Sequence, residues 1–207
     1  MKDVLLTFCG SIVALSAHGQ FRSEHHAAHG AQSAFYECSD PLPLDPGKFN
    51  ARPGQLYFQF DTTSHPKGLK ALKFTWLPDE PTGYFTAYLI NTTDSTLNAR
   101  RQDGSLIMIQ EALNAKGEWA PIEYWTYSGC GNSYFSPLVL PQGQLALIPV
   151  RRYSGPFRTK LRLKWKNGTR TLYSDSFEGS IEPGQFNRLT EPVEGILYHG
   201  PASFLED

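Results

Sequence analysis

The residues whose types could support chemistry gather in one stretch of the chain, Gly117 to Tyr134. This stretch contains Cys130 between two glycines, in a loop where a thiol would be exposed. A nucleophilic thiol needs a base nearby. Upstream, His65 precedes a proline, and the only downstream histidine, His199, lies near the end of the chain. The sequence therefore favours a structural thiol or a disulfide at Cys130 over a nucleophile.

Glu123 lies in the same stretch and is the other candidate for a reaction. Glycosidases use two carboxylates at a set separation, and one strand cannot establish that separation. The sequence favours a solvated or hydrogen-bonded Glu123, and a hydrolase centred on Cys130 or Glu123 is a minor alternative. The sequence contains no phosphate-binding loop, no set of ligands at the spacing of a zinc site and no dinucleotide-binding fingerprint. We therefore expect that the protein is not an enzyme and binds no cofactor or metal.

Large aromatic side chains make the same stretch a candidate binding surface. They could stack on sugar rings or anchor a protein partner, although one Trp of a β-sandwich is commonly in its core. The candidate residues are Trp119, Tyr124, Trp125 and Tyr127.

A second candidate surface is cationic. It could bind an acidic glycan, lipopolysaccharide phosphates or an acidic protein, and the alternative is a solvated sheet face whose lysines protect an edge. Its candidate residues are Arg158, Lys160, Arg162 and Lys164, with Arg151 and Arg152 nearby in the sequence. The formal net charge of the whole chain is −1, so we expect no partner among nucleic acids or anionic membranes.

The N-terminus has the pattern of a secretory signal. Lys2 precedes the mostly apolar run Val4 to Ala17, and small residues at Ala17 and Gly19 predict cleavage after Gly19. Cleavage after Ala17 and a lipid-modified Cys9 are the alternatives. The run is too short to span a membrane, so we expect an exported protein in the periplasm, on the cell surface or in the medium.

Removal of residues 1–19 would leave Cys38 and Cys130, and an even count in an exported chain predicts one disulfide. In the chain-entropy model, a disulfide that closes such a long loop stabilises the folded state by about 4 to 5 kcal/mol. The alternative is that Cys38 and Cys130 are two unrelated thiols. Residues 20–48 have the composition of a flexible or extended arm. Its His25, His26 and His29 are interpreted as linker rather than as a metal site.

Short apolar runs separated by Gly, Pro and Asn predict strands in the rest of the chain. Leu69 to Trp76 is ambiguous between helix and strand, and Pro121 predicts an edge or a bulge within the aromatic stretch. The other expected strands are Gln55–Phe60, Tyr84–Asn91, an edge strand at Ser95–Arg100, Ser105–Leu113, Gly117–Ser128, Leu138–Leu140 and Gln144–Val150.

The clearest pattern is the strict alternation of apolar and cationic residues from Phe157 to Lys166, typical of a half-buried strand. Asn167-Gly168 then predicts a type I′ hairpin turn with a return strand from Thr169 to Phe177. That register predicts a cross-strand pair between Lys160 and Asp175 and places Arg162 over the ring of Tyr173.

Eight or nine such strands with little helix predict an immunoglobulin-like antiparallel β-sandwich over residues 49–188, followed by a tail, 189–207. Three stretches, Glu118–Tyr134, Tyr153–Trp165 and Ser174–Phe186, resemble uncharacterised secreted bacterial β-sandwich proteins. The resemblance covers residues 84–186 and implies the fold and export, but no activity or site. We expect a non-catalytic protein that binds a protein partner in an envelope assembly, with a carbohydrate-binding module as the alternative.

Overall fold

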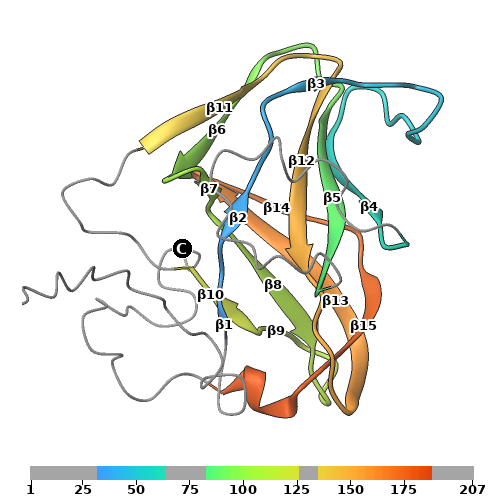
Figure 1. Cartoon of the computed structure of the whole chain (residues 1–207), viewed down its shortest axis with the longest axis vertical. Coiled ribbons are helices and arrows are strands. Elements are labelled where there is room, and N and C mark those ends of the chain that lie inside the picture. The colour runs from blue at the N-terminus through green and yellow to red at the C-terminus, as the bar shows by residue number, and fades with distance from the viewer. Residues whose placement is uncertain (1–31, 64–82, 126–134, 188–207) are drawn as a thin grey trace, which may run out of the picture.

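A computed structural model describes residues 32–63, 83–125 and 135–187, and these residues form an all-β structure (Figure 1). The expected leader, Leu69–Trp76, Tyr127, Cys130 and the tail lie outside the described residues. The strands are β1 (Gln32–Ser33), β2 (Tyr36–Glu37), β3 (Leu42–Pro43), β4 (Leu56–Asp61), β5 (Tyr84–Asn91), β6 (Leu97–Gln102), β7 (Ser105–Leu106), β8 (Met108–Leu113), β9 (Trp119–Pro121), β10 (Glu123–Tyr124), β11 (Phe135–Leu140), β12 (Gln144–Arg151), β13 (Phe157–Asn167), β14 (Arg170–Tyr173) and β15 (Phe177–Ile181), followed by a short 3₁₀ turn, η4 (Pro183–Phe186).

One sheet has the strand order β3-β12-β5-β4 and is antiparallel. The strand predicted at Tyr84–Asn91 is confirmed as β5, with β12 on one side and β4 on the other. This central position explains why β5 is apolar on both faces: one face meets the core, and the other carries Ile90 into a second cluster with Tyr57 and Leu145.

A second antiparallel sheet has the order β14-β13-β8-β9, and β15 also pairs with β13. The alternation predicted for β13 is confirmed, because Leu161, Leu163 and Trp165 are buried while Arg158 and Lys160 are exposed. Pro121 lies in the edge strand β9, which pairs only with β8 among the described strands, as expected for a residue with no donor.

The hairpin at the end of β13 departs from the predicted register by two residues. Asn167 pairs with Arg170, so the central turn residues are Gly168 and Thr169. Of these two residues only Gly168 has a positive φ, 63°, which is the pattern of a type II′ turn rather than a type I′ turn. The predicted turn placed Asn167 at a position that the strand itself occupies.

The return strand is also interrupted by a bulge at Ser174 to Ser176. Lys164 pairs with Tyr173 and Leu161 pairs with Phe177, so three residues of the return strand lie opposite two of β13. The Ser174 hydroxyl accepts a hydrogen bond from Leu163 N at 2.8 Å and completes the ladder there.

The shifted turn and the bulge change which side chains lie opposite each other, and so they affect the two predicted side-chain pairs. The Lys160–Asp175 pair is wrong, because Asp175 instead forms an ion pair with Arg52 and Lys160 lies opposite Glu178. The contact between Arg162 and the ring of Tyr173 is confirmed, since Arg162 reaches that ring along the diagonal.

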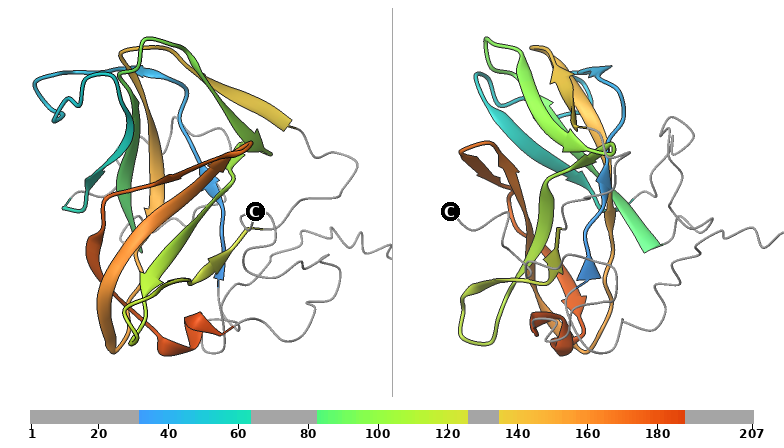
Figure 2. Two further views of the ribbon diagram at one scale, coloured as in Figure 1. Left: turned by 180° about the vertical axis from the view of Figure 1, so that it is seen from behind. Right: turned by 90° about the vertical axis from the view of Figure 1, so that its left-hand side faces the viewer.

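At bends in the chain, a segment that the sequence predicts as one strand is divided into two strands that belong to different sheets. The described residues therefore form more strands than the sequence predicts. Ile107 separates β7, in a third sheet of order β11-β6-β7-β2, from β8 in the second sheet. The polar strand expected at an edge, β6, lies between β11 and β7 in that third sheet. Figure 2 shows the resulting curl of the strands from two further sides.

Residues 32–43, within the segment expected to be a flexible or extended arm, pair with the rest of the structure at three short strands. Tyr36 and Cys38 are both buried in the main core, and β2 pairs with β7 while β3 pairs with β12. The short β1 runs parallel to β10. Hydrophobic burial favours this arrangement, because Tyr36 removes a large ring from water.

All three four- or five-stranded sheets contribute side chains to the main core. Phe58 of β4 meets Trp165 of β13 edge to face, with ring centroids 6.4 Å apart and planes at 89°. Phe177 of β15 packs against Phe60 and Phe85 at centroid distances of 4.9 and 5.1 Å. These aromatic contacts join the first sheet to the second. None of the described residues forms an apolar helix long enough to cross a membrane.

Leu163 gives a direct test of this packing. Replacing this fully buried residue by Ala should lower the free energy of unfolding by about 2–5 kcal/mol, because the cavity lies between closely packed rings. Lys160→Ala, at an exposed position of the same strand, should change it by less than about 0.5 kcal/mol. Urea unfolding of both variants makes the comparison, and equal losses would contradict the assigned faces of β13.

Candidate functional site

The outer face of the second sheet carries the most ordered group of exposed and half-buried polar and aromatic side chains. The guanidinium of Arg162 lies between two rings, with Cζ 4.3 Å from the centroid of Trp119 and 4.1 Å from that of Tyr173. Trp119 comes from β9 and Tyr173 from β14, so the group spans the whole width of the sheet.

Glu111 of β8 holds the guanidinium of Arg162 in place through an ion pair. Arg162 Nε donates to Glu111 Oε2 at 2.7 Å, and Nη2 lies 2.6 Å from the same oxygen. Lys164 Nζ lies 3.8 Å from Oε1 of the same carboxylate. Glu111 is directly opposite Arg162 in the β8–β13 register, so the pairing of the strands brings the charges together. We call Glu111, Trp119, Arg162 and Tyr173 the Arg162 stack.

The structure separates the four aromatic candidates. Tyr124 and Trp125 are buried, at 8% and 6% exposure, so they are not available as a surface. The chain bends at Ile122 after β9, and β10 then pairs with β1 inside the molecule. Trp119 is half-buried at the sheet edge, and Tyr127 lies outside the described residues. Of the three aromatic candidates that the structure describes, Trp119 alone joins the cationic candidates on one face.

The four cationic candidates do lie on one face of β13, in two environments. Arg158 and Lys160 are exposed and, among the described residues, form no ion pair. Arg162 and Lys164 are half-buried, and Glu111 neutralises part of their charge. The predicted cationic stripe therefore consists of two half-buried side chains that Glu111 holds, Arg162 and Lys164, and two solvated side chains, Arg158 and Lys160.

Glu123 occupies a different place, a polar cluster inside the molecule at 2% exposure. Its Oε2 accepts hydrogen bonds from the Tyr36 hydroxyl and from Gln110 N, the latter at 2.6 Å. Its Oε1 accepts from the Tyr153 hydroxyl at 2.7 Å and from Gln110 Nε2 at 3.1 Å. The carboxylate thereby joins β2, β8 and β10 with the segment after β12.

Burial raises the pKa of Glu123, while the hydrogen bonds from Tyr36, Tyr153 and Gln110 and the charge of Arg151 lower it in part. Burial and the neighbouring Glu123 raise the pKa values of Tyr36 and Tyr153. With both oxygens occupied by donors, the carboxylate is arranged to hold strands together. The sequence left open whether Glu123 is solvated or hydrogen-bonded, and no pattern in it indicated Tyr36 or Tyr153 as partners.

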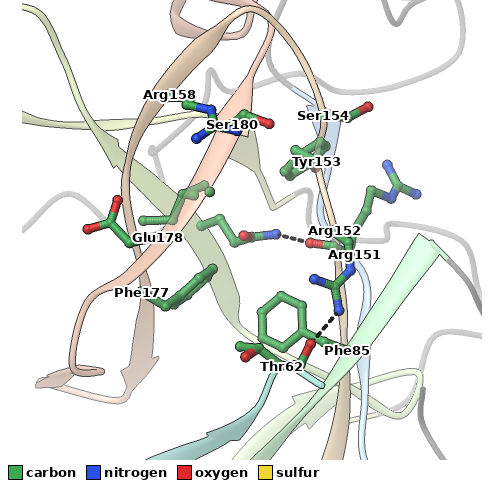
Figure 3. Close-up of a pocket in the computed structure, with 13 residues that line it drawn as sticks. Thr62, Phe85, Arg151, Arg152, Tyr153, Ser154, Arg158, Phe177, Glu178 and Ser180 are labelled. Carbon is green, nitrogen blue, oxygen red and sulfur yellow. Dashed lines mark hydrogen bonds between the residues drawn. The ribbon is translucent and has the colours of Figure 1, made fainter. Parts of the chain in front are cut away.

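A pocket of about 500 Å³ adjoins this cluster through Gln110 and Tyr153. It opens between the segment after β12 and the strands β13 and β15 (Figure 3). Its other lining residues are Thr62, Phe85, Arg151, Arg152, Ser154, Arg158, Leu161, Phe177, Glu178, Gly179 and Ser180.

No disulfide and no cluster of three or more metal-binding side chains is present within the described residues. Cys38 is a free, buried thiol whose sulfur lies 3.5 Å from Arg101 Nη1. Burial raises the pKa of this thiol, and Arg101 lowers it in part. Cys130, its expected partner, lies outside the described residues.

Comparison with family models, curated proteins and solved structures finds no match for this chain. The resemblance to secreted bacterial β-sandwich proteins therefore stays a prediction, and a function has to be argued from the geometry.

The buried carboxylate allows a test of its pKa. Glu123→Gln should destabilise the protein by about 1–3 kcal/mol for each donor it leaves without a partner. Burial raises the pKa of Glu123 in the folded state above its ordinary value of 4.5. The contribution of Glu123 to the free energy of unfolding is therefore fully present below pH 4.5, and it declines as the pH rises through the pKa of the folded state. The destabilisation measured in urea should therefore be largest in acid and shrink toward neutral pH.

Glu118→Gln serves as the control, because Glu118 is exposed on the same segment and pairs only with Asn114 among the described residues. Its effect on unfolding should be small at every pH. A Glu123→Gln destabilisation that grows with pH would contradict a raised pKa.

Proposed function

We propose that this chain is an exported, non-catalytic, immunoglobulin-like β-sandwich protein that binds a protein partner in an envelope assembly through the Arg162 stack. Face-to-face packing of β5 and β12 on β13 and β8 supports the sandwich. The N-terminal pattern of Lys2, an apolar run and small residues supports export.

The observation that carries the proposal is the fixed position of Arg162 between Trp119 and Tyr173. Trp, Tyr and Arg are the residues that most often dominate binding energy at protein interfaces. Glu111 and the two rings already hold the guanidinium, so docking a partner would cost little side-chain entropy. The ion pair uses Nε and Nη2, which leaves Nη1 to donate to a partner's carboxylate or carbonyl oxygen.

Charge on the same face favours an acidic partner. Arg158 and Lys160 extend the surface beyond the stack, and the carboxylates directly opposite the cations of β13 in the strand register are Glu111 and Glu178. Cations outnumber carboxylates, so an acidic segment would be attracted and oriented at low ionic strength.

The two alternatives have less support. A sugar site needs open aromatic faces, yet Arg162 covers one face of both Trp119 and Tyr173 while Tyr124 and Trp125 are in the interior. A hydrolase centred on Glu123 needs a carboxylate that can reach a substrate, and both oxygens of this one accept internal hydrogen bonds.

The test is quantitative capture of the native partner from the envelope fraction. Arg162→Gln and Tyr173→Ala should each weaken binding by about 30-fold, as expected for a central interface residue worth about 2 kcal/mol. Lys160→Glu should weaken it by a smaller factor that diminishes as salt is added. Because Lys160 is exposed, that variant separates a loss of binding from a loss of folding.

Arg100 and Phe135 provide a matched control elsewhere on the molecule. Arg100 lies over the ring of Phe135 with Cζ 4.4 Å from the centroid, and Phe135 is exposed to a similar degree as Tyr173, 42% against 45%. Arg100→Gln and Phe135→Ala should leave capture unchanged. Equal capture by all variants, or equal losses at both sites, would refute the assignment of the Arg162 stack.

A further inference from the structure

The inter-sheet pocket has an apolar wall made by facing strands of the two sheets. Phe85 of β5 and Phe177 of β15 pack at a centroid distance of 5.1 Å, and both line the pocket together with the buried Leu161. Figure 3 shows the two rings side by side in the lower part of the view. Such a wall favours a ligand with an apolar ring or chain.

The rest of the lining is cationic. Arg152 is held in place, because its Nη2 donates to Thr62 O at 2.9 Å and its Cζ lies 5.5 Å from the centroid of Phe85 (Figure 3). Arg158 lines the opening from β13 and, in the described part of the chain, has no ion-pair partner. The one carboxylate among the lining residues is that of Glu178. The lining therefore has an excess of positive charge.

Behind these arginines lies the polar cluster of Glu123. Gln110 Nε2 donates to Arg151 O at 3.0 Å as well as to Glu123, which fixes the amide at the back of the pocket. The guanidinium of Arg151 interacts with Tyr84, Tyr153 and Glu123. Its charge is thus partly compensated inside the protein, and Arg152 and Arg158 are the cations available to a ligand.

We propose that this pocket binds a small organic anion with an apolar body, which Arg152 and Arg158 attract from two sides of the lining while its body packs on Phe85 and Phe177. Its volume of about 500 Å³ lies within the range of small-molecule sites. Each arginine carries a fork of donors that suits a carboxylate, sulfonate or phosphate. Arg158 borders both this pocket and the proposed protein-binding face, but no residue of the Arg162 stack lines the pocket, so a failure to bind the anion would leave the role of the stack untouched.

A matched pair of fluorescent probes tests the two halves of this proposal. The anion 1-anilinonaphthalene-8-sulfonate and the neutral N-phenyl-1-naphthylamine share one ring system and differ in the sulfonate. Titration of the full chain should give saturable binding of the sulfonate at one site. Arg152→Gln and Arg158→Gln should each weaken it by about tenfold, as for the loss of one charge-assisted hydrogen bond, and should leave the neutral probe unchanged.

Two further variants separate the pocket from the protein surface in general. Ser180→Phe places a ring in the lining and should abolish binding of both probes. Arg170→Gln removes an exposed arginine of β14 that does not line this pocket, and should change neither. Tyr173→Ala, in the Arg162 stack, should also have no effect.

Three results would overturn the proposal. They are no saturable binding of the sulfonate, sulfonate affinity that is unchanged in both arginine variants, and losses of the same size in Arg170→Gln. A circular dichroism spectrum and an unfolding midpoint recorded for each variant ensure that a loss reflects the site rather than unfolding.

Discussion

The alternation of apolar and cationic side chains along β13 determines both the packing between the sheets and the outer face of the second sheet. Successive side chains of a strand point to opposite faces, so one run of residues serves two purposes. Leu161, Leu163 and Trp165 enter the core between the sheets, and Arg162 and Lys164 are left on the outer face. A slip of one residue would exchange these sets, burying charges and exposing the core. The face that we propose for binding is therefore fixed by the same packing that stabilises the fold.

A second constraint is the buried carboxylate of Glu123. Short strands such as β2 and β10 contribute few ladder hydrogen bonds, and the carboxylate joins them to β8 by accepting bonds from Tyr36 and Gln110. Burial of a charged group is costly unless it is fully hydrogen-bonded, and here both oxygens are. Glu123 also fixes Gln110 and Tyr153 at the edge of the inter-sheet pocket, so the cluster shapes a cavity without facing into it.

Local patterns predicted what local interactions decide. The alternation of β13, the apolar β5 and the proline at the edge of β9 all followed from the period of two and from backbone donors. The missed features depend on a single residue or on distant parts of the chain. A turn shifted to Gly168 and a bulge at Ser174 moved Asp175 away from Lys160. A bend at Ile122 took Tyr124 and Trp125 into the interior, although a regular strand would have left one of them outside. The burial of Tyr36 depends on Glu123, 87 residues away, and no local pattern reports such a contact.

Photo-crosslinking in the native envelope, with a benzophenone amino acid at position 173, tests whether a protein partner binds at the Arg162 stack. Tyr173 ends the Arg162 stack at the sheet edge, where a photoreactive ring replaces a phenol ring without disturbing the core. The same amino acid at position 135, which is equally exposed on another sheet, serves as the comparison. Our account predicts one crosslinked protein partner from position 173 and none from position 135. The same products from both positions, or a partner from position 135 alone, would contradict it.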